Sequence, residues 1–145
     1  MRISEVLAAK SSQEVITVAP DTTVRDLLGL LAQHNVGALI VSSDGSSVEG
    51  IVSERDVVRR LREDEAVLGA PVSSIMTVEV HTCRREDAVN DLMKVMTERR
   101  IRHVPVTEDG VLTGIISIGD VVKSRMGELE FERDQLDSYV HTSQS

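Results

Sequence analysis

The sequence predicts an α/β (α+β) fold in which two pseudo-symmetric halves pack sheet against sheet. Three observations predict it. The chain repeats itself once, each copy has the same order of strand-like and helix-like segments, and one copy alone has too few apolar residues to form a core. With 145 residues, 41% of them hydrophobic, the two copies together can bury a core of ordinary size.

The repeat is visible when the chain is shifted against itself by 65 residues. Identical residues then coincide: Val15, Thr17, Val24, Asp26, Leu27, Val41, Asp44 and Gly45 fall on Val80, Thr82, Val89, Asp91, Leu92, Val106, Asp109 and Gly110. Beyond the Asp-Gly turn the shift becomes 64, and "GIVSERD" (50–56) falls on "GIISIGD" (114–120). Turns tolerate the loss of one residue, so the pattern indicates a true duplication. Two copies are too few for a solenoid and form a pair.

Each copy predicts the order strand, helix, strand, strand, helix. A short extended segment (15–18 or 80–83) precedes a helix with apolar residues at helical spacing: Val24, Leu27, Leu28 and Leu31, or Val89, Leu92, Met93 and Met96. The runs "ALIV" and "HVPV" predict buried strands, and an Asp-Gly turn leads to a second strand that ends in the repeated motif. The last helix of each copy is expected to begin near Arg55 or Gly119. Thr23 and Asp26 resemble a capping box at the start of the first helix.

The predicted organisation is a first module at residues 1–71, a second module at 72–126 and a helical tail at 127–145. The leader "MRISEVL" before the first copy is similar to "PVSSIMT" before the second. We expect each leader to form a short helical turn that clasps the module it precedes.

The tail predicts an amphipathic helix. Counted from Met126, its apolar positions 126, 129, 136 and 140 fit one helical stripe, with Arg133 between them. The tail also contributes −4 of the net charge of −8. Such a helix either folds back on its own module or meets a partner.

Composition and charge exclude several classes of protein. Cys83 is the single cysteine, which excludes an internal disulfide and a cysteine metal cluster, and the four histidines lack ligand spacing, so we expect no metal. No segment has the apolar length of a signal peptide or a membrane span, which predicts a soluble, cytoplasmic protein without membrane contact. The net charge of −8 opposes binding to nucleic acid. Cys83 replaces Val18 of the first copy, which favours a packing role over a redox role.

The repeated Ser-x-x-Asp has two compatible interpretations. Ser53 with Asp56, and Ser117 with Asp120, can each form a capping box at a helix N-terminus. A helix N-terminus also offers amide groups to an anion, and an Asp carboxylate there can accept hydrogen bonds from both hydroxyls of a ribose. The cap by itself does not distinguish the two interpretations.

The duplicated unit resembles a tandem pair of CBS domains, the Bateman module. The resemblance rests on "NVGALIV" and "RIRHVPV" before the turns, "GIVSERDVV" and "GIISIGDVV" after them, and "IMT" (75–77) at the join, and it covers about residues 1–126. It implies binding of an adenine nucleotide (AMP, ADP or ATP, with S-adenosylmethionine or NAD(H) as further candidates) in two clefts between the modules. In the family the Asp of the motif holds the ribose hydroxyls, which corresponds to Asp56 and Asp120 here.

The resemblance also implies which residues line each cleft. The first cleft is expected to use Val15, Val36, Gly37, Ala38, Ile115, Ser117 and Asp120. The second is expected to use Val80, Ile101, Arg102, His103, Ile51, Ser53 and Asp56. Basic residues just before the second strand commonly meet phosphate in the family, and only the second copy has them, as Arg102 and His103. We therefore expect the phosphate contacts in the second cleft, with Arg55 as a further contact, and one strong site at most. Arg99 and Arg100 either serve a ligand or complement the helix C-terminus.

The resemblance implies a non-catalytic regulatory sensor that binds an adenine nucleotide and signals to a partner protein. The sequence has no arrangement of nucleophile, base and orienting residue, and no Gly-rich phosphate loop. An alternative is a protein-interaction or redox adaptor, similar to thioredoxin regulators, with weak or vestigial nucleotide sites. Because CBS pairs usually assemble as discs of two chains, the resemblance also implies a homodimer, which the tail helix helps to seal.

Overall fold

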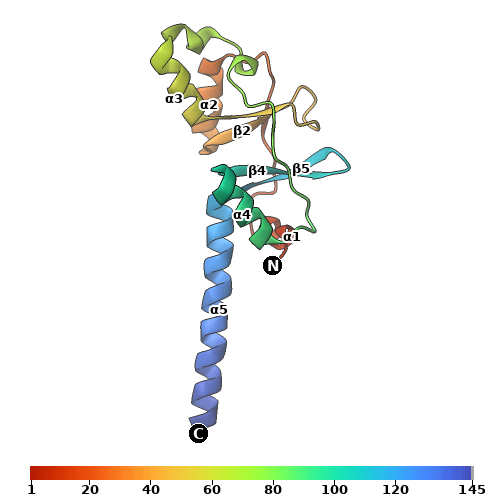
Figure 1. Ribbon diagram of the computed structural model, residues 1–145, viewed down its shortest axis with the longest axis vertical. Coiled ribbons are helices and arrows are strands. Elements are labelled where there is room, and N and C mark those ends of the chain that lie inside the picture. The colour runs from red at the N-terminus through yellow and green to blue at the C-terminus, as the bar shows by residue number, and fades with distance from the viewer. Residues whose placement is uncertain (145) are drawn as a thin grey trace.

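The computed structural model describes residues 1–144. Two modules lie one above the other, with their small sheets adjacent in the middle and helices on the outer sides (Figure 1). This arrangement confirms the predicted mixed fold of two packed halves. None of the helices in the described part of the chain has the length and hydropathy needed to span a membrane.

The first module follows the predicted order of elements. It consists of β1 (Thr17–Val18), α2 (Val24–His34), β2 (Ala38–Val41), β3 (Gly50–Ser53) and α3 (Glu54–Glu63). β1 pairs with β2 in parallel and β2 pairs with β3 antiparallel, so Ile40 lies between Thr17 and Ile51 in the sheet. All residues of β2 are buried, as expected for a central strand that is covered on both faces.

The second module repeats this order with one difference. It contains α4 (Val89–Arg99), β4 (His103–Glu108), β5 (Val111–Ser117) and α5 (Ile118–Gln144). The first strand expected at 80–83 is reduced to a single parallel bridge between Cys83 and Val106. Only Cys83 makes the ladder hydrogen bonds: its N donates to the O of Pro105 at 3.0 Å, and its O accepts from the N of Thr107 at 2.9 Å.

The leaders pack against the opposite modules, so the expectation that each clasps the module it precedes is wrong. Three apolar residues of α1 (Ile3–Ala8) are buried in the core of the second module: Ile3, Val6 and Leu7. The linker between the modules contains two short 3-10 turns, η1 (Glu65–Gly69) and η2 (Val72–Ser74). Two residues of the second leader are buried in the core of the first module: Val72 and Ile75.

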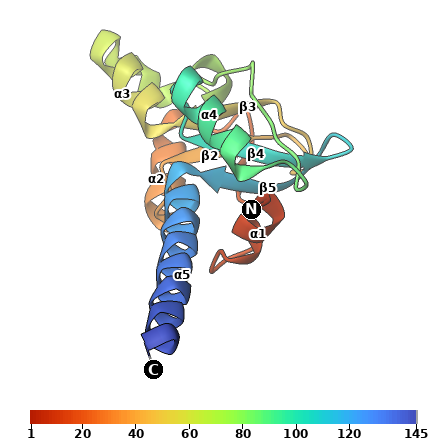
Figure 2. The ribbon, with the colours of Figure 1, turned by 60° about the horizontal axis from the view of Figure 1, so that its bottom comes forward.

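Backbone contacts show the same exchange. The N of Val89, at the start of α4, donates to the O of Met1 at 3.0 Å. The N of Val24, at the start of α2, donates to the O of Ala70 at 2.9 Å. Figure 2 shows α1 beside β5 of the second module. The apolar spacing of a leader shows that one of its faces is buried, but it does not show which module buries that face.

The exchange explains the glycine that opens each repeated motif. A Cβ added at Gly50 would lie 2.6 Å from Sδ of Met76 and 2.9 Å from the O of Thr77, both in the second leader. A Cβ added at Gly114 would lie 3.0 Å from Cδ2 of Leu7, in the first leader. Each glycine therefore lets the leader of the other copy approach the strand closely.

The predicted tail is the continuation of the last helix of the second module. α5 runs without a break from Ile118 to Gln144 and extends away from both modules as a rod (Figure 1); only Ser145 of the predicted tail lies outside the described residues. From Met126 to Val140 its large apolar side chains are exposed, among them Leu129 and Leu136. Of the two alternatives for the tail, the structure therefore excludes a helix that folds back on its own module.

Candidate functional site

All seven residues expected in the second cleft line one cavity of about 610 Å³ between the modules. The first module contributes Ile51, Ser53 and Asp56 from β3 and α3, and the second contributes Val80 and the segment 101–103. The cavity therefore brings together residues that lie between 24 positions (Asp56 and Val80) and 52 positions (Ile51 and His103) apart in the sequence. Their contact with a ligand remains a prediction.

Asp56 combines a helix cap with a free carboxylate oxygen. Its Oδ2 accepts hydrogen bonds from the N of Ser53 at 2.9 Å and from Oγ of Ser53 at 3.0 Å. Its own N donates to Oγ of Ser53 at 3.3 Å, which completes the capping box at the start of α3. In the described part of the chain these bonds use one carboxylate oxygen, so Oδ1 is available to a ligand.

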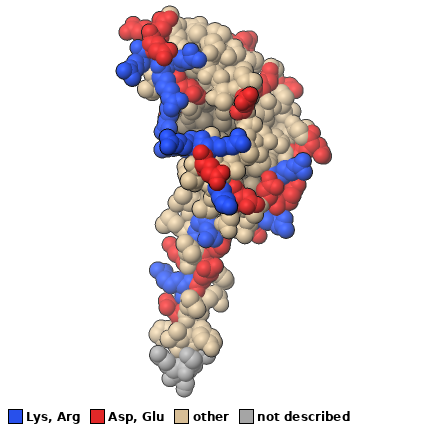
Figure 3. Space-filling view, in the orientation of Figure 1, with Lys and Arg blue, Asp and Glu red and all other residues tan. Residues whose placement is uncertain are grey.

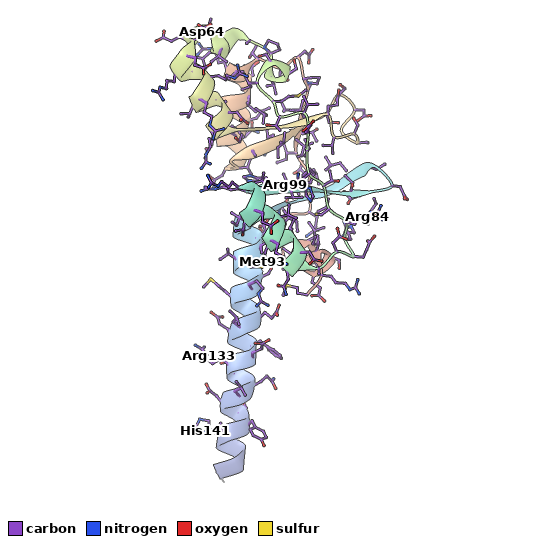
Figure 4. All side chains as sticks on the ribbon, in the orientation of Figure 1. Asp64, Arg84, Met93, Arg99, Arg133 and His141 are labelled. Carbon is purple, nitrogen blue, oxygen red and sulfur yellow. The ribbon has the colours of Figure 1, made fainter. Side chains whose placement is uncertain are left out.

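Five arginines surround the second cavity. Two lie on α3, and three lie at the end of α4 or in the segment between α4 and β4: Arg55, Arg59, Arg99, Arg100 and Arg102. Figure 3 shows Lys and Arg atoms around a hollow between the modules, and Figure 4 places Arg99 at the end of α4 that faces the first module. Glu54, Asp56 and Glu79 supply the opposing charge, which leaves the cavity with an excess of positive charge suited to phosphate.

Arg100 adopts a left-handed backbone conformation at the C-cap of α4, with φ 56°. Its counterpart in the first module, Asn35, has φ 52°. Asn tolerates this conformation well, whereas Arg pays a conformational cost there. A left-handed residue at a helix C-cap is common, so this conformation belongs to the helix end in both copies, and only the residue type differs at the edge of the cavity.

The first cleft is a second cavity of about 690 Å³, and only part of the expected set lines it. Four residues do so: Val36, Ala38, Ile115 and Asp120. Ile16 lines the cavity instead of Val15, because successive residues of an extended chain point to opposite sides. Gly37 lines the second cavity instead, and a Cβ there would approach Glu54 and His103. Ser117 acts as a cap, since its Oγ accepts from the N of Asp120 at 3.1 Å.

Asp120 is paired with Lys10, a residue that sequence reasoning did not place in either cleft. Nζ of Lys10 lies 3.0 Å from Oδ2 of Asp120 and donates a hydrogen bond to the O of Ile115 at 2.9 Å. Burial tends to raise the pKa of Asp120, but the hydrogen bonds from Ser117 and the Lys10 ammonium outweigh it and leave this pKa below its ordinary value. The carboxylate is therefore charged at neutral pH.

His103 lies between the two clefts. It lines the second cavity, and it is paired with Ser117 in the β4–β5 ladder, where it experiences the charges of Asp120 and Lys10. Burial lowers the pKa of His103 below its ordinary value, with Asp120 acting in the opposite direction. At pH 7 this side chain is neutral, so Arg102 is the better phosphate contact of the two.

Sequence reasoning also missed residues on three helices and on the segment that follows the second leader. Lys123 and His34 line the first cavity, and Arg59 and His81 line the second. Arg59 follows the repeated motif by one turn of α3 and could have been found from helical spacing. Lys10 carried no such signal, because it follows the leader and precedes the first strand.

Cys83 is buried in the core of the second module. Its Sγ donates to the O of Pro105 at 3.7 Å. Burial, together with the charge of Asp87, raises the pKa of the Cys83 thiol to about 12. The thiolate is the reactive form of cysteine, so this environment weighs against a redox role. Among residues 1–144, the His, Cys, Asp and Glu side chains form no group of three that could hold a metal ion.

The arrangement of two interlocked modules, with a cleft on either side of their shared wall, agrees with the family comparison. The sequence pattern of the CBS domain matches residues 3–63 and 72–127. The chain belongs to the CBS domain family. Each match includes one leader and one complete module, so the family pattern follows the sequence order and not the exchanged packing.

Several CBS proteins are similar to this chain over most of its length. CBS domain-containing protein CBSX3, mitochondrial, of Arabidopsis thaliana is 36% identical over 146 residues, which cover 95% of this chain and 71% of that protein. The crystal structure of the CBS-domain containing protein ATU1752 from Agrobacterium tumefaciens has a TM-score of 0.81 and 42% identity, and covers 86% of this chain and 99% of that one. The crystal structure of CBSX2 in complex with AMP has a TM-score of 0.73 and 27% identity, and covers 87% and 96%.

Proposed function

We propose that this protein is a non-catalytic regulatory CBS pair that binds an adenine nucleotide in its second cleft. The observation that carries the proposal is the combination, in one cavity, of the free oxygen of Asp56 and five arginines. The structure of CBSX2 with AMP supports an adenine nucleotide as the ligand class. AMP, ADP and ATP are the first candidates, and S-adenosylmethionine and NAD(H) the next.

The cavity suggests how the parts of the nucleotide divide among its residues. Asp56 is placed to accept the ribose hydroxyls beside the start of α3. Three apolar side chains are available to cover the adenine: Ile51, Val80 and Ile101. The arginines would meet the phosphates, because a guanidinium group binds phosphate oxygens in a bidentate manner. Ligand binding in a cleft between two modules would shift their arrangement, and a partner protein in the cytoplasm would read that change.

Replacing Asp56 by Asn tests the proposal. Asn keeps a capping side chain but removes the charge that strengthens hydrogen bonds to the ribose, so affinity should fall about 10- to 100-fold. The measurement is titration calorimetry of the ligand-stripped protein with AMP, ADP, ATP, S-adenosylmethionine and NADH. Asp120→Asn is the matched control, because it makes the same change in the other cleft and should leave the strong site intact. Unchanged affinity in Asp56→Asn would show that the ribose lies elsewhere, and no binding of any ligand by the wild type would contradict the proposal.

We further propose that two copies of the chain associate through α5. Six positions of this helix follow one another at alternating spacings of four and three residues: Val122, Met126, Leu129, Arg133, Leu136 and Val140. This is the spacing of a two-stranded coiled coil. The apolar members of the stripe are exposed, as they must be to meet a second helix.

The double variant Leu129→Glu, Leu136→Glu should convert a homodimer into a monomer, because it places charges in the contact between the helices. Mass measurement in solution, by light scattering or sedimentation, reports the outcome. Phe131→Glu is the matched control, since Phe131 is as exposed as Leu136 (64% and 65%) but lies on the opposite side of α5. A dimer mass that survives the double variant would remove α5 from the interface, and a monomeric wild type would contradict the homodimer.

A further inference from the structure

The carboxylate of the first cleft is already paired with a cationic side chain of the protein. Nζ of Lys10 contacts both Oδ2 of Asp120 and the O of Ile115, at 3.0 and 2.9 Å. These two residues are the ones expected to meet the ribose and the adenine there. In the second cleft the corresponding Asp56 has no lysine partner among the described residues, and only its own cap bonds are present.

The segment that carries Lys10 is held in place independently of the ion pair. Residues 9–14, which we call the strap, connect α1 to β1 along the wall of the first cavity. Nε2 of Gln13 donates to the O of Leu7 at 2.8 Å and to the O of Lys10 at 3.2 Å. Leu7 is buried in the core of the second module, so the backbone of Lys10 is fixed near the cleft. The ammonium therefore pairs with Asp120 without further ordering of the backbone.

The ion pair is sheltered from solvent. The side chains of Lys10 and Asp120 are each 24% exposed. An ion pair of this kind is screened by salt less than a pair on the open surface. The pair uses Oδ2 of Asp120, the oxygen that also accepts the cap bond from the N of Ser117 at 2.9 Å, so none of these bonds uses Oδ1. A ligand that approaches Oδ1 therefore meets a carboxylate whose charge is already offset by the Lys10 ammonium.

The second copy has no counterpart of the strap. The O of Met1 accepts a hydrogen bond from the start of α4, and the O of Ala70 accepts one from the start of α2, so these two residues occupy equivalent places in the two leaders. They lie 69 positions apart, whereas the strands that follow the leaders lie only 65 positions apart. The first copy therefore has four additional residues between its leader and its first strand. Lys10 lies within this longer connection, which explains why only one cleft contains such a lysine.

We propose that Lys10 is a latch that closes the first cleft to nucleosides. Its ammonium neutralises the Asp120 carboxylate and lines the cavity beside it, so a nucleoside gains a full charge-assisted hydrogen bond to Asp120 only after displacing Lys10. The inference rests on the proposed function, because it assumes that Asp120 and Asp56 would hold the same part of the ligand. It makes Lys10 the residue that sets the difference in affinity between the two clefts of a duplicated chain.

The test is calorimetric titration of adenosine into the double variant Lys10→Met, Asp56→Asn. The Asp56→Asn change weakens the second cleft, so the titration reports binding in the first cleft. Adenosine carries the ribose hydroxyls but no phosphate, so the loss of a positive charge does not weaken its attraction to the cleft. Removal of the competing ion pair should tighten binding about tenfold relative to Asp56→Asn alone. Lys123→Met in the same background is the matched control: Lys123 lines the same cavity but has no ion pair with Asp120 in the described structure. Its adenosine affinity should not change.

Each other result overturns the latch. Weaker binding in Lys10→Met would mean that Lys10 contacts the nucleoside itself. Equal tightening in Lys10→Met and Lys123→Met would mean that only the total charge of the cleft matters. No change in Lys10→Met, while the wild type keeps its Asp56-dependent nucleotide binding, would overturn the latch and leave the proposed function standing. Absence of nucleotide binding in the wild type would overturn the proposed function, and the latch with it.

Discussion

Replacing Ile3 by alanine is expected to destabilise the protein by about 2–5 kcal/mol, because the variant leaves a cavity in a packed core. Ile3 is only the third residue of the chain, but its side chain is 0% exposed and lies in the core of the second module. Denaturant unfolding measures the change in the free energy of unfolding. Ile118→Ala is the matched control, since it removes the same atoms from a side chain that is 43% exposed, and it should have a much smaller effect.

Hydrogen exchange on Ile3→Ala tests the exchanged packing itself. Amide protection should fall first in β4 and β5, which share a core with α1, and less in β2 and β3. Val72→Ala should give the opposite pattern, because Val72 is buried in the first module. Loss of protection in the first module upon Ile3→Ala would show that the leader clasps the module it precedes. A destabilisation below about 1 kcal/mol would show that α1 is not part of the core.

Replacing Gly50 by alanine is expected to destabilise the protein by about 1–3 kcal/mol, more than the same change at Gly114. The new Cβ at Gly50 would lie 2.9 Å from the O of Thr77, a backbone atom that accepts a hydrogen bond from Ile51 and cannot easily move. At Gly114 the Cβ would meet only side-chain atoms at its closest, those of Leu7 at 3.0 and 3.3 Å, and these can turn aside.

Gly29→Ala serves as the control for these two variants. Gly29 lies within α2, and a Cβ there would meet nothing within 4 Å. Alanine in a helix should therefore stabilise the protein by about 0.5–1 kcal/mol relative to glycine. Thermal or denaturant unfolding gives all three values in one series. Equal destabilisation by Gly50→Ala and Gly114→Ala would contradict the backbone contact as the cause.

The local elements of the fold could be predicted from the sequence because their causes are local. The alternation of strand-like runs and helical stripes, together with the Asp-Gly turns, marks β2 and β4 and the helices that flank them within a residue or two. Ser53 and Asp56 form the capping box that their spacing indicates. The set expected in the second cleft lines one cavity, and most of its members lie at or beside the start or end of a predicted strand or helix.

The first cleft was predicted less completely, and the reason is also physical. An error of one residue along an extended segment exchanges the two sides of the chain, which is why Ile16 and not Val15 lines the cavity. Gly37 lies near the wall that the two clefts share. Its position in the sequence repeat did not show which of the two cavities it would line.

The sequence by itself determined the duplication, the order of elements in each copy, the caps and the arginine-rich second copy, since these depend on residues close together in the chain. Only the tertiary structure decided which module buries each leader, where the strap places Lys10, and that α5 extends away with its apolar stripe exposed. Each of those outcomes depends on contacts between residues far apart in sequence. An apolar or charged residue in the sequence indicates that its side chain will be buried or paired. It does not indicate which distant residue the folded chain will place beside it.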